Sequence, residues 1–282
     1  CYGAAARDPE HACANRTRAV TPSLREARRL PGSPCTPDKY RREPQVCRFG
    51  VPAGQARGSV ALVGDSHALH WRAALEVVAR AKRWQGFSLT SVGCLFSAAT
   101  RALGEPALSI CRRWNRSVQA WFRRHPEVST VFVSHYAVPM VVVAPGRKTL
   151  AVQLAGLRRA WGALPKTVKH LVVVRDIPSS TDAAFECVRD VIAAHNRRAG
   201  LACAVRRPDA VAWDSSVSAV LRLRSGRYRY VDLTDFFCSR HYCYPVIGGV
   251  RVYRDVDHMT VAYSTTLGPY LLRAVDRLMA SW

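Results

Sequence analysis

The sequence predicts an α/β fold in which a central parallel sheet carries helices on both faces, preceded by a disulfide-stapled N-terminal extension. From residue 59 onward, short apolar runs rich in β-branched residues alternate with stretches of helical periodicity. This alternation is typical of parallel strands joined by crossover helices. Before that point the chain is rich in Pro, Arg and Gly and has little periodicity. We therefore expect residues 1–57 to form an extension that packs on a main domain of residues 58–282.

Five apolar runs are the expected strands, and helical spacing fills the intervals between them. The strands are expected at residues 60–63, 87–92, 130–134, 168–174 and 228–231. The helices are expected at about residues 67–83, 112–124, 149–163, 183–199 and 208–224, with a final helix at about 260–280. In the extension only residues 23–30 hint at a helix. Gly248-Gly249 between apolar residues is typical of a tight hairpin turn.

The chain is strongly basic, with a formal net charge of +22 at pH 7 over 282 residues. Its arginines are scattered in pairs such as Arg28-Arg29 and Arg112-Arg113, and no basic helix with interleaved aromatic residues is present. We therefore expect no nucleic-acid partner and favour residence near a negatively charged envelope surface. No apolar run reaches 18 residues, so no membrane-spanning helix is expected. The Ala/Arg-rich start resembles a cut inside a longer protein, or a mature form after processing, more than a signal peptide.

Ten cysteines fall as neighbours along the chain and predict five local disulfides. The pairing expected from proximity is Cys1–Cys13, Cys35–Cys47, Cys94–Cys111, Cys187–Cys203 and Cys238–Cys243. Disulfides persist in oxidising compartments, so the domain is expected to be extracytoplasmic. Two alternatives concern single groups: Cys238, His241 and Cys243 could bind zinc, and Cys1 could carry a lipid. Our prediction is that the protein uses no metal and no cofactor.

Ser66 is the candidate nucleophile because it follows a strand-to-helix turn. Gly64 and Asp65 break the expected strand, and helical spacing of apolar residues begins at His67. A serine at such a turn projects its hydroxyl above the sheet edge, beside free backbone N–H groups and the positive end of a helix. That position suits attack on an acyl carbonyl. An Asp-Ser pair is also ordinary helix-capping chemistry, so a partner for the serine is needed.

The partner is expected near the far end of the chain, in the run Asp255-Val-Asp257-His258. His258 would take the proton of Ser66 and later return it. Asp255, three residues earlier, would accept from the imidazole N–H and so fix its tautomer. Asp257 is the competing orienter, although an adjacent residue usually points away from its neighbour. The hairpin at Gly248-Gly249 would deliver this run to the carboxyl ends of the strands, where open α/β sheets place their sites.

Both ends of this constellation resemble a known superfamily. Gly64-Asp65-Ser66-His67 resembles the first motif of the SGNH (GDSL-like) hydrolases, and Asp255-x-x-His258-Met-Thr resembles their last motif. The chain is most similar to the SGNH domains fused behind the acyltransferase family 3 membrane domain in bacterial envelope O-acyltransferases. The similarity runs from about residue 35 to the C-terminus. It implies that residues 58–282 form a three-layer sandwich around a central parallel sheet.

The resemblance also implies a function and its partners. It implies a serine-dependent O-acyltransferase that forms an ester on Ser66, with acetyl the commonest group and the hydroxyl of a cell-envelope glycan as acceptor. A membrane acyltransferase domain, expected in the same full-length protein, would present the acyl group and tether this domain. Two alternatives remain open: a secreted carbohydrate acetylesterase with the same Ser-His-Asp triad, and a non-enzymatic module that binds glycan or lipid.

Two positions bear on the oxyanion hole of this family. Gly93, at the end of an expected strand, matches the glycine of the second motif, whose N–H serves the oxyanion; it could also be an ordinary turn glycine. The third motif normally contains an Asn, where this chain has Ser134-His135-Tyr136. His135 is the candidate replacement donor, with a buried structural histidine as the alternative. Losing one donor commonly costs about 10²–10³ in turnover.

Overall fold

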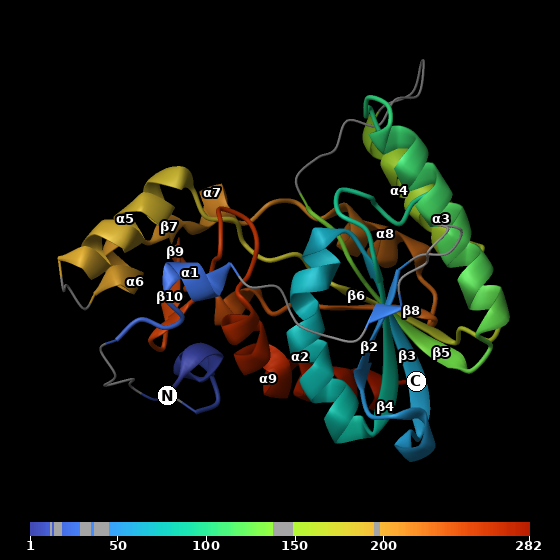
Figure 1. Cartoon of the computed structure of the whole chain (residues 1–282), viewed down its shortest axis with the longest axis horizontal. Coiled ribbons are helices and arrows are strands. Elements are labelled where there is room, and N and C mark those ends of the chain that lie inside the picture. Colours follow the sequence, from blue (N-terminus) through green and yellow to red (C-terminus); the bar gives the residue numbers. More distant parts are fainter. Residues whose placement is uncertain (12, 14–18, 29–34, 37–44, 138–148, 195–197) are drawn as a thin grey trace.

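The structure is a computed structural model that describes residues 1–11, 13, 19–28, 35–36, 45–137, 149–194 and 198–282. A seven-stranded sheet lies between two groups of helices (Figure 1). Helices α2 (Ser66–Lys82) and α9 (Val261–Ala280) cover one face, and α3 (Ala107–Arg124), α4 (Thr149–Gly162) and α8 (Ser215–Leu223) cover the other. This arrangement confirms the predicted α/β three-layer fold.

The strand order places the first predicted strand at the centre of the sheet. The order is β1-β2-β4-β3-β5-β6-β8, and the last five of these run parallel. Their bounds are β3 Gly58–Gly64, β4 Trp84–Thr90, β5 Val128–Ser134, β6 His170–Val174 and β8 Tyr228–Val231. Along β3, Val60 and Leu62 pack in one core while Ala61 and Val63 pack in the other. A strand buried on both faces reads as a continuous apolar run, which is why it was visible in the sequence.

The predicted helices are found, but α3 begins at Ala107 instead of about residue 112, and two of the expected helices are divided. Residues 208–224 were expected as one helix, but the chain forms α7 (Arg207–Ala210) and then α8. Asp214 is the N-cap of α8, because its side chain accepts from the N–H groups of Ser216 and Val217. The second helix therefore begins directly after Asp214. The helix expected at 183–199 is α5 (Asp182–Ala193), followed by the short α6 (Ala199–Ala202). None of the helices in the described part of the chain is long and apolar enough to cross a membrane.

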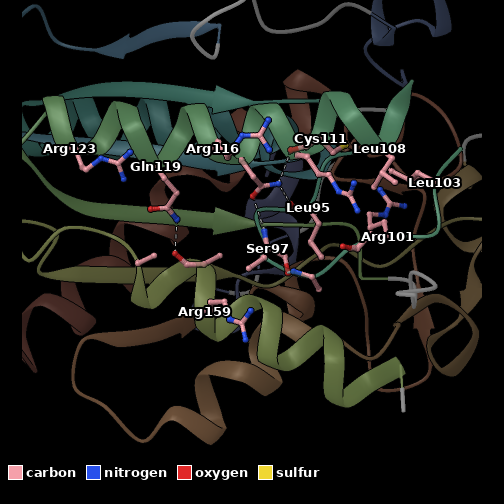
Figure 2. A pocket seen from close by; sticks show the side chains of 17 residues that line it. Leu95, Ser97, Arg101, Leu103, Leu108, Cys111, Arg116, Gln119, Arg123 and Arg159 are labelled. Carbon is pink, nitrogen blue, oxygen red and sulfur yellow. Dashed lines mark hydrogen bonds between the residues drawn. The ribbon is translucent and has the colours of Figure 1, made fainter. Parts of the chain in front are cut away.

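Helices α3 and α4 lie side by side on their face of the sheet. Gln119 of α3 donates from Nε2 to the carbonyl of Ala160 in α4 at 2.7 Å, and this bond joins the two helices (Figure 2). Both helices pack their apolar faces on the sheet, where Trp121 and Trp161 are buried.

The expected extension contributes to the main sheet. Strands β1 (Cys35–Thr36) and β2 (Val46–Gly50) form its antiparallel edge, and Phe49 packs in the core. The sheet thus crosses the boundary that we expected between residues 57 and 58. The segment 23–30 holds only one turn of helix, α1 (Leu24–Ala27), within the described residues.

The first residues of the chain also pack on the main domain. The 3-10 helix η1 (Gly3–Arg7) contacts α9, where the N–H of Ala4 donates to Thr266 Oγ1 at 3.0 Å. The N–H of Gly3 donates to the carbonyl of Gly248 at 3.1 Å, and the N–H of Arg251 donates to that of Thr21 at 2.7 Å. The N-terminal segment is therefore bonded to the hairpin that precedes the expected catalytic histidine.

That hairpin forms as predicted from its glycines. Strands β10 (Val246–Ile247) and β11 (Val250–Arg251) pair antiparallel, and Gly248 and Gly249 both have positive φ, at 54° and 75°. A two-residue hairpin turn needs positive φ at both central positions, which glycine adopts without steric cost. A further two-stranded sheet pairs β7 (Val205–Arg206) with β9 (Tyr242–Cys243).

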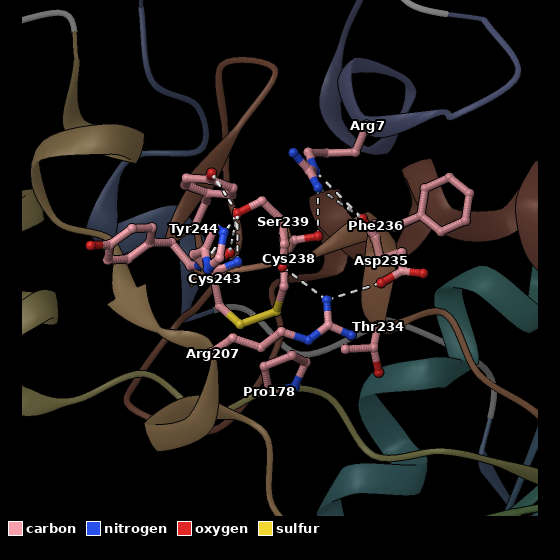
Figure 3. Close-up of a disulfide and its surroundings, with 12 residues drawn as sticks. Arg7, Pro178, Arg207, Thr234, Asp235, Phe236, Cys238, Ser239, Cys243 and Tyr244 are labelled. Carbon is pink, nitrogen blue, oxygen red and sulfur yellow. Dashed lines mark hydrogen bonds and ion pairs between the residues drawn. A yellow bond between two sulfur atoms is a disulfide. The ribbon is translucent and has the colours of Figure 1, made fainter.

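Four of the predicted disulfides are present as paired: Cys1–Cys13, Cys94–Cys111, Cys187–Cys203 and Cys238–Cys243. Cys47 is also disulfide-bonded, and β1 places the backbone of Cys35 opposite it, but the side chain of Cys35 lies outside the described residues. The Cys238–Cys243 bond shows that these thiols are not zinc ligands. Around it, Arg7 donates to the carbonyl of Cys238, and Arg207 donates to the carbonyl of Ser239 at 2.9 Å (Figure 3).

Candidate active site

The turn that carries Ser66 is held by the ends of β3 and β5. Gly64 has φ 151°, and a Cβ there would lie 2.0 Å from the carbonyl oxygen of Ser134. Only glycine therefore allows the two strands to end so close together. Asp65 caps α2: one carboxylate oxygen accepts from the N–H of His67 at 2.9 Å and the other from the N–H of Tyr136 at 3.1 Å. Ser66 begins the helix and is partly exposed.

The loop that carries His258 is closed on itself. Tyr253 and Met259 form an isolated β-bridge, and the N–H of Arg254 donates to the carbonyl of His258 at 3.0 Å. The carbonyl of Val256 accepts from the N–H of Ser180 at 2.7 Å, which fixes the loop against the segment that follows β6. His258 is thereby placed by backbone contacts on both sides, directly before α9.

Two carboxylates face the same nitrogen of His258. Nδ1 lies 2.9 and 3.0 Å from the two oxygens of Asp255 and 2.8 Å from Oδ1 of Asp257. Asp255 also accepts from the backbone N–H groups of Asp257 and His258, at 3.2 and 2.7 Å. Asp255 therefore takes the position predicted for the orienting residue, but Asp257 does not point away as expected and shares the task.

Burial and these carboxylates act in opposite directions on His258. Burial alone would lower the pKa of the imidazole, but the bonds and charges of Asp255 and Asp257 outweigh it and raise the pKa to about 9. Burial would likewise raise the pKa of Asp255, and its bonds from His258 hold that pKa well below the usual range instead. The imidazolium form of His258 is thus strongly stabilised in the resting protein.

The two ends of the chain meet at the start of α2. The ring of His258 lies 4.8 Å from the ring of His67, the residue next to Ser66. His258 Nε2, the nitrogen that would serve the serine, is buried and has no hydrogen-bond partner in the described part of the chain. Ser66 and His258 are not hydrogen-bonded to each other among the described residues. Catalytic bonds of this kind are often long before substrate binds.

A second histidine–carboxylate pair, which the sequence did not reveal, lies beside the first. His67 Nδ1 lies 2.7 Å from Oδ1 of Asp176, and both side chains are buried. Burial would lower the pKa of His67, but the charge and hydrogen bond of Asp176 raise it. Asp176 comes two residues after β6 ends, at the same sheet edge as Ser66. A carboxylate directly after a buried apolar run was the signal that could have identified it.

The ligand atoms of His67, His70 and Asp176 lie within 4.8 Å of one another, close enough to hold a metal ion. The Asp176 carboxylate, however, also accepts from the N–H groups of Ile177 and Ala137, at 2.9 and 2.8 Å. Three donors already satisfy this carboxylate. We therefore interpret this group as a hydrogen-bonded network that holds His67.

The two oxyanion candidates have different environments. Gly93 is exposed, has φ 70°, and its N–H donates to no protein acceptor among the described residues. His135, by contrast, is buried and uses both ring nitrogens: Nε2 accepts from the N–H of Phe96 at 3.1 Å, and Nδ1 lies 3.0 Å from Ser216 Oγ. Burial lowers the pKa of His135 to about 4, so it is a neutral structural residue. Of the two interpretations left open for His135, this geometry favours the buried structural histidine over the oxyanion donor, because both ring nitrogens are engaged.

The fold and the site define an α/β domain with a serine at a strand-to-helix turn and a histidine–aspartate pair before the last helix. The chain belongs to the family of SGNH domains fused to AT3 domains, whose model matches residues 34–273. This confirms the resemblance drawn from the two end motifs. A search of curated proteins finds no matching sequence.

Among solved structures, the chain is similar to the periplasmic domain of a lipopolysaccharide acetyltransferase from Salmonella ser. Paratyphi A. The TM-score is 0.57 with 10% sequence identity, and the match covers 81% of this chain and 90% of that one. At this identity the likeness concerns the fold alone. The two domains thus have a similar fold at low sequence identity.

Proposed function

We propose that this chain is the extracytoplasmic domain of an O-acyltransferase, which passes an acyl group through an ester on Ser66 to a hydroxyl of a cell-envelope glycan. The observation that carries the proposal is the buried, unpartnered Nε2 of His258, held beside the start of α2 while Nδ1 is bound by Asp255. A histidine oriented on one side and free on the other is what a serine nucleophile requires.

The first half of the reaction loads the serine. Ser66 Oγ attacks the acyl carbonyl carbon and gives its proton to His258 Nε2, while Asp255 and Asp257 stabilise the resulting imidazolium through Nδ1. In this proposal the oxyanion forms at the N-terminus of α2, where the positive end of the helix would stabilise it and the N–H of Gly93 is the proposed second donor. The bond to the leaving group then breaks, and the leaving group takes the proton from His258.

The second half transfers the acyl group. A hydroxyl of the acceptor gives its proton to His258 Nε2 and attacks the acyl carbon of the Ser66 ester. The ester bond breaks, and Ser66 Oγ regains a proton from His258. The products are an acylated acceptor and the free serine, so a single histidine serves both halves as base and then as acid.

The donor and the compartment follow from the family and the cysteines. Domains of this family are fused to AT3 domains, which supports a membrane acyltransferase domain as the source of the acyl group, in the same protein. The disulfides support an oxidising, extracytoplasmic location. The fold shared with the lipopolysaccharide acetyltransferase domain supports acetyl as the group and a glycan as the acceptor.

Intact-mass measurement after incubation with p-nitrophenyl acetate tests the serine ester. We expect an added acetyl group on the wild-type chain, located at Ser66 by peptide mapping, and none on Ser66→Ala. His258→Asn should slow acetylation strongly while Ser66 stays in place. Acetylation at other residues to the same extent in wild-type and Ser66→Ala protein would rule out the proposed nucleophile.

A second measurement separates transfer from hydrolysis. Fragments of bacterial envelope polysaccharides are added to the acetylated chain, and the mass of each product is determined. Transfer predicts an acetylated oligosaccharide and faster loss of the acetyl group from Ser66 when the acceptor is present. Release of acetate at a rate that no acceptor changes would identify the protein as an esterase.

A further inference from the structure

A groove lies between α3 and α4, on the face of the sheet opposite α2. Its volume is about 530 Å³, and it is lined by the loop of residues 95–103 together with the two helices (Figure 2). The floor is apolar and aliphatic, with Leu95, Leu103, Leu108 and Ala160 among its members. None of the described residues that line it is aromatic or acidic. The groove therefore offers hydrocarbon contacts but no ring on which a sugar could stack.

Arginines surround this aliphatic floor. Arg112, Arg116 and Arg123 lie at helical spacing along α3, and Arg159 comes from α4. Figure 2 labels Arg116, Arg123 and Arg159. Among the described residues Arg116, Arg123 and Arg159 form no ion pair, whereas Arg175 and Arg207 elsewhere are paired with aspartates. Arg112 is near enough to Glu105 for its charge to lower the pKa of that carboxyl. Like charges on one rim repel one another. A bound anion would relieve that repulsion and complete the site.

The groove is joined to the loop of the candidate active site. Cys94–Cys111 links the residue after Gly93 to α3. Asn115 fastens the same loop by accepting from the N–H of Ser97 at 3.1 Å and donating to the carbonyl of Leu95 at 3.0 Å. The fifth arginine, Arg101, donates to the carbonyl of Gly93. One end of the groove thus lies against the loop that carries the oxyanion candidate.

We propose that this groove binds a membrane-resident anionic lipid, with its phosphate on the arginines and part of one hydrocarbon chain on the leucines and alanines. Guanidinium groups bind phosphate oxygens in pairs of parallel hydrogen bonds. The aliphatic floor matches a hydrocarbon chain better than a glycan, because sugar rings and nucleic-acid bases are usually bound by aromatic side chains. The proposal does not depend on acyl transfer, since binding is measured directly.

Calorimetric titration with dodecyl phosphate, below its micelle concentration, tests this lipid site. The test variant is Arg116→Gln with Arg159→Gln, which removes one rim charge from each helix. The matched control is Arg113→Gln with Arg158→Gln, which removes the same net charge from exposed positions on the same helices outside the groove. Because each charge-assisted contact is lost in the first variant only, we expect affinity about tenfold or more lower there and within about twofold of wild type in the control.

Two further probes identify the ligand class. Dodecyl maltoside, which has the same chain and no charge, should bind at least about tenfold more weakly than dodecyl phosphate. Vesicles of phosphatidylglycerol and phosphatidylcholine should retain the wild-type chain and the control variant more strongly than the Arg116/Arg159 variant. Melting temperatures of both variants check that the fold is intact.

Three results would overturn the proposal. Equal loss of affinity in the two double variants would mean that overall charge alone attracts the ligand. Unchanged affinity in the Arg116/Arg159 variant would exclude the groove. Tighter binding of polygalacturonate than of dodecyl phosphate, lost in the same variant, would assign the groove to an acidic glycan instead.

Discussion

Two histidine–carboxylate pairs lie side by side at the start of α2, and their surroundings are opposite. His67 and Asp176 are sealed, with side-chain exposures of 3% and 2%, and the carboxylate is satisfied by backbone N–H groups as well. His258 and Asp255 are at the rim, with exposures of 19% and 48%, and one nitrogen of His258 is unpartnered. The same chemistry thus serves two purposes. The sealed pair holds α2 to the segment after β6, and the open pair is the one to which we assign proton transfer in the proposed reaction.

The largest expected effect is the loss of activity when His258 of the open pair is replaced. His258→Asn should lower the rate of acetylation by p-nitrophenyl acetate by about 10⁴-fold, because the base that accepts the serine proton is lost. The melting temperature should stay close to that of the wild-type chain. Rapid mixing with mass detection measures the rate. A His258→Asn protein that is acetylated as fast as wild type would show that another base serves Ser66.

The two carboxylates at Nδ1 of His258 can be ranked by a pair of isosteric variants. Asp255→Asn should reduce the rate by about 10³-fold, since this residue is the one fixed by two backbone N–H groups. Asp257→Asn should reduce it by about tenfold, as Asp255 remains in place. Steady-state kcat/KM values compare them. Equal losses would mean that the two aspartates act as one unit, and the reverse order would make Asp257 the orienting residue.

The sealed pair of His67 and Asp176 should be detectable by its contribution to the free energy of unfolding. His67→Gln leaves the buried Asp176 charge without its partner, so unfolding should become easier by about 3 kcal/mol, a fall of about 5–10 °C in the melting temperature. His11→Gln is the matched control, because the His11 side chain is 76% exposed where it lies 3.4 Å from Asp8. Exposed pairs contribute about 0–1 kcal/mol. Similar shifts for the two variants, measured by calorimetry, would contradict the distinction between the pairs.

The last comparison concerns the pH dependence of the open pair. Since the pKa of His258 is raised to about 9, most of its imidazole is protonated at neutral pH and cannot accept a proton. The kcat/KM for acetylation should therefore rise about tenfold per pH unit up to about pH 9 and then level off. Asp255→Asn and Asp257→Asn should both move this inflection to lower pH. A rate that is already constant above pH 7 would show that His258 titrates normally.

The raised pKa of His258 also makes the stability of the fold depend on pH. A histidine whose pKa is higher in the folded than in the unfolded chain stabilises the fold fully below the unfolded value of 6.5. That contribution is lost as the pH rises through about 9. The pH range in which His258 is free to accept a proton is thus the range in which its contribution to the stability of the fold is smallest.

The sequence was sufficient for the central features of the site. The strand at β3 is buried on both faces and so appears as an unbroken apolar run, and Gly64 and Asp65 mark its turn into α2. The hairpin at Gly248-Gly249 was visible because only glycine suits both of its positive φ angles. Local rules of this kind act within a few residues, so a single sequence displays them.

What the sequence did not reveal depends on contacts between distant segments. Strand β2 lies in an Arg- and Pro-rich stretch and is ordered by pairing with β4, so its local pattern was weak. Asp176 gained its role from His67, which is 109 positions away along the chain. For His135 the sequence left two interpretations open, because its two partners, the N–H of Phe96 and the hydroxyl of Ser216, come from separate segments.

The N-terminal contacts have a practical consequence for work on this domain. The family match begins at residue 34, yet Ala4 is fully buried and Gly3 has no room for a side chain against Thr266. A recombinant fragment trimmed to the family boundary would lose the partners of Gly248 and Arg251 and uncover part of α9. The hairpin that precedes His258 would then be held less firmly, so activity assays should use the chain from residue 1.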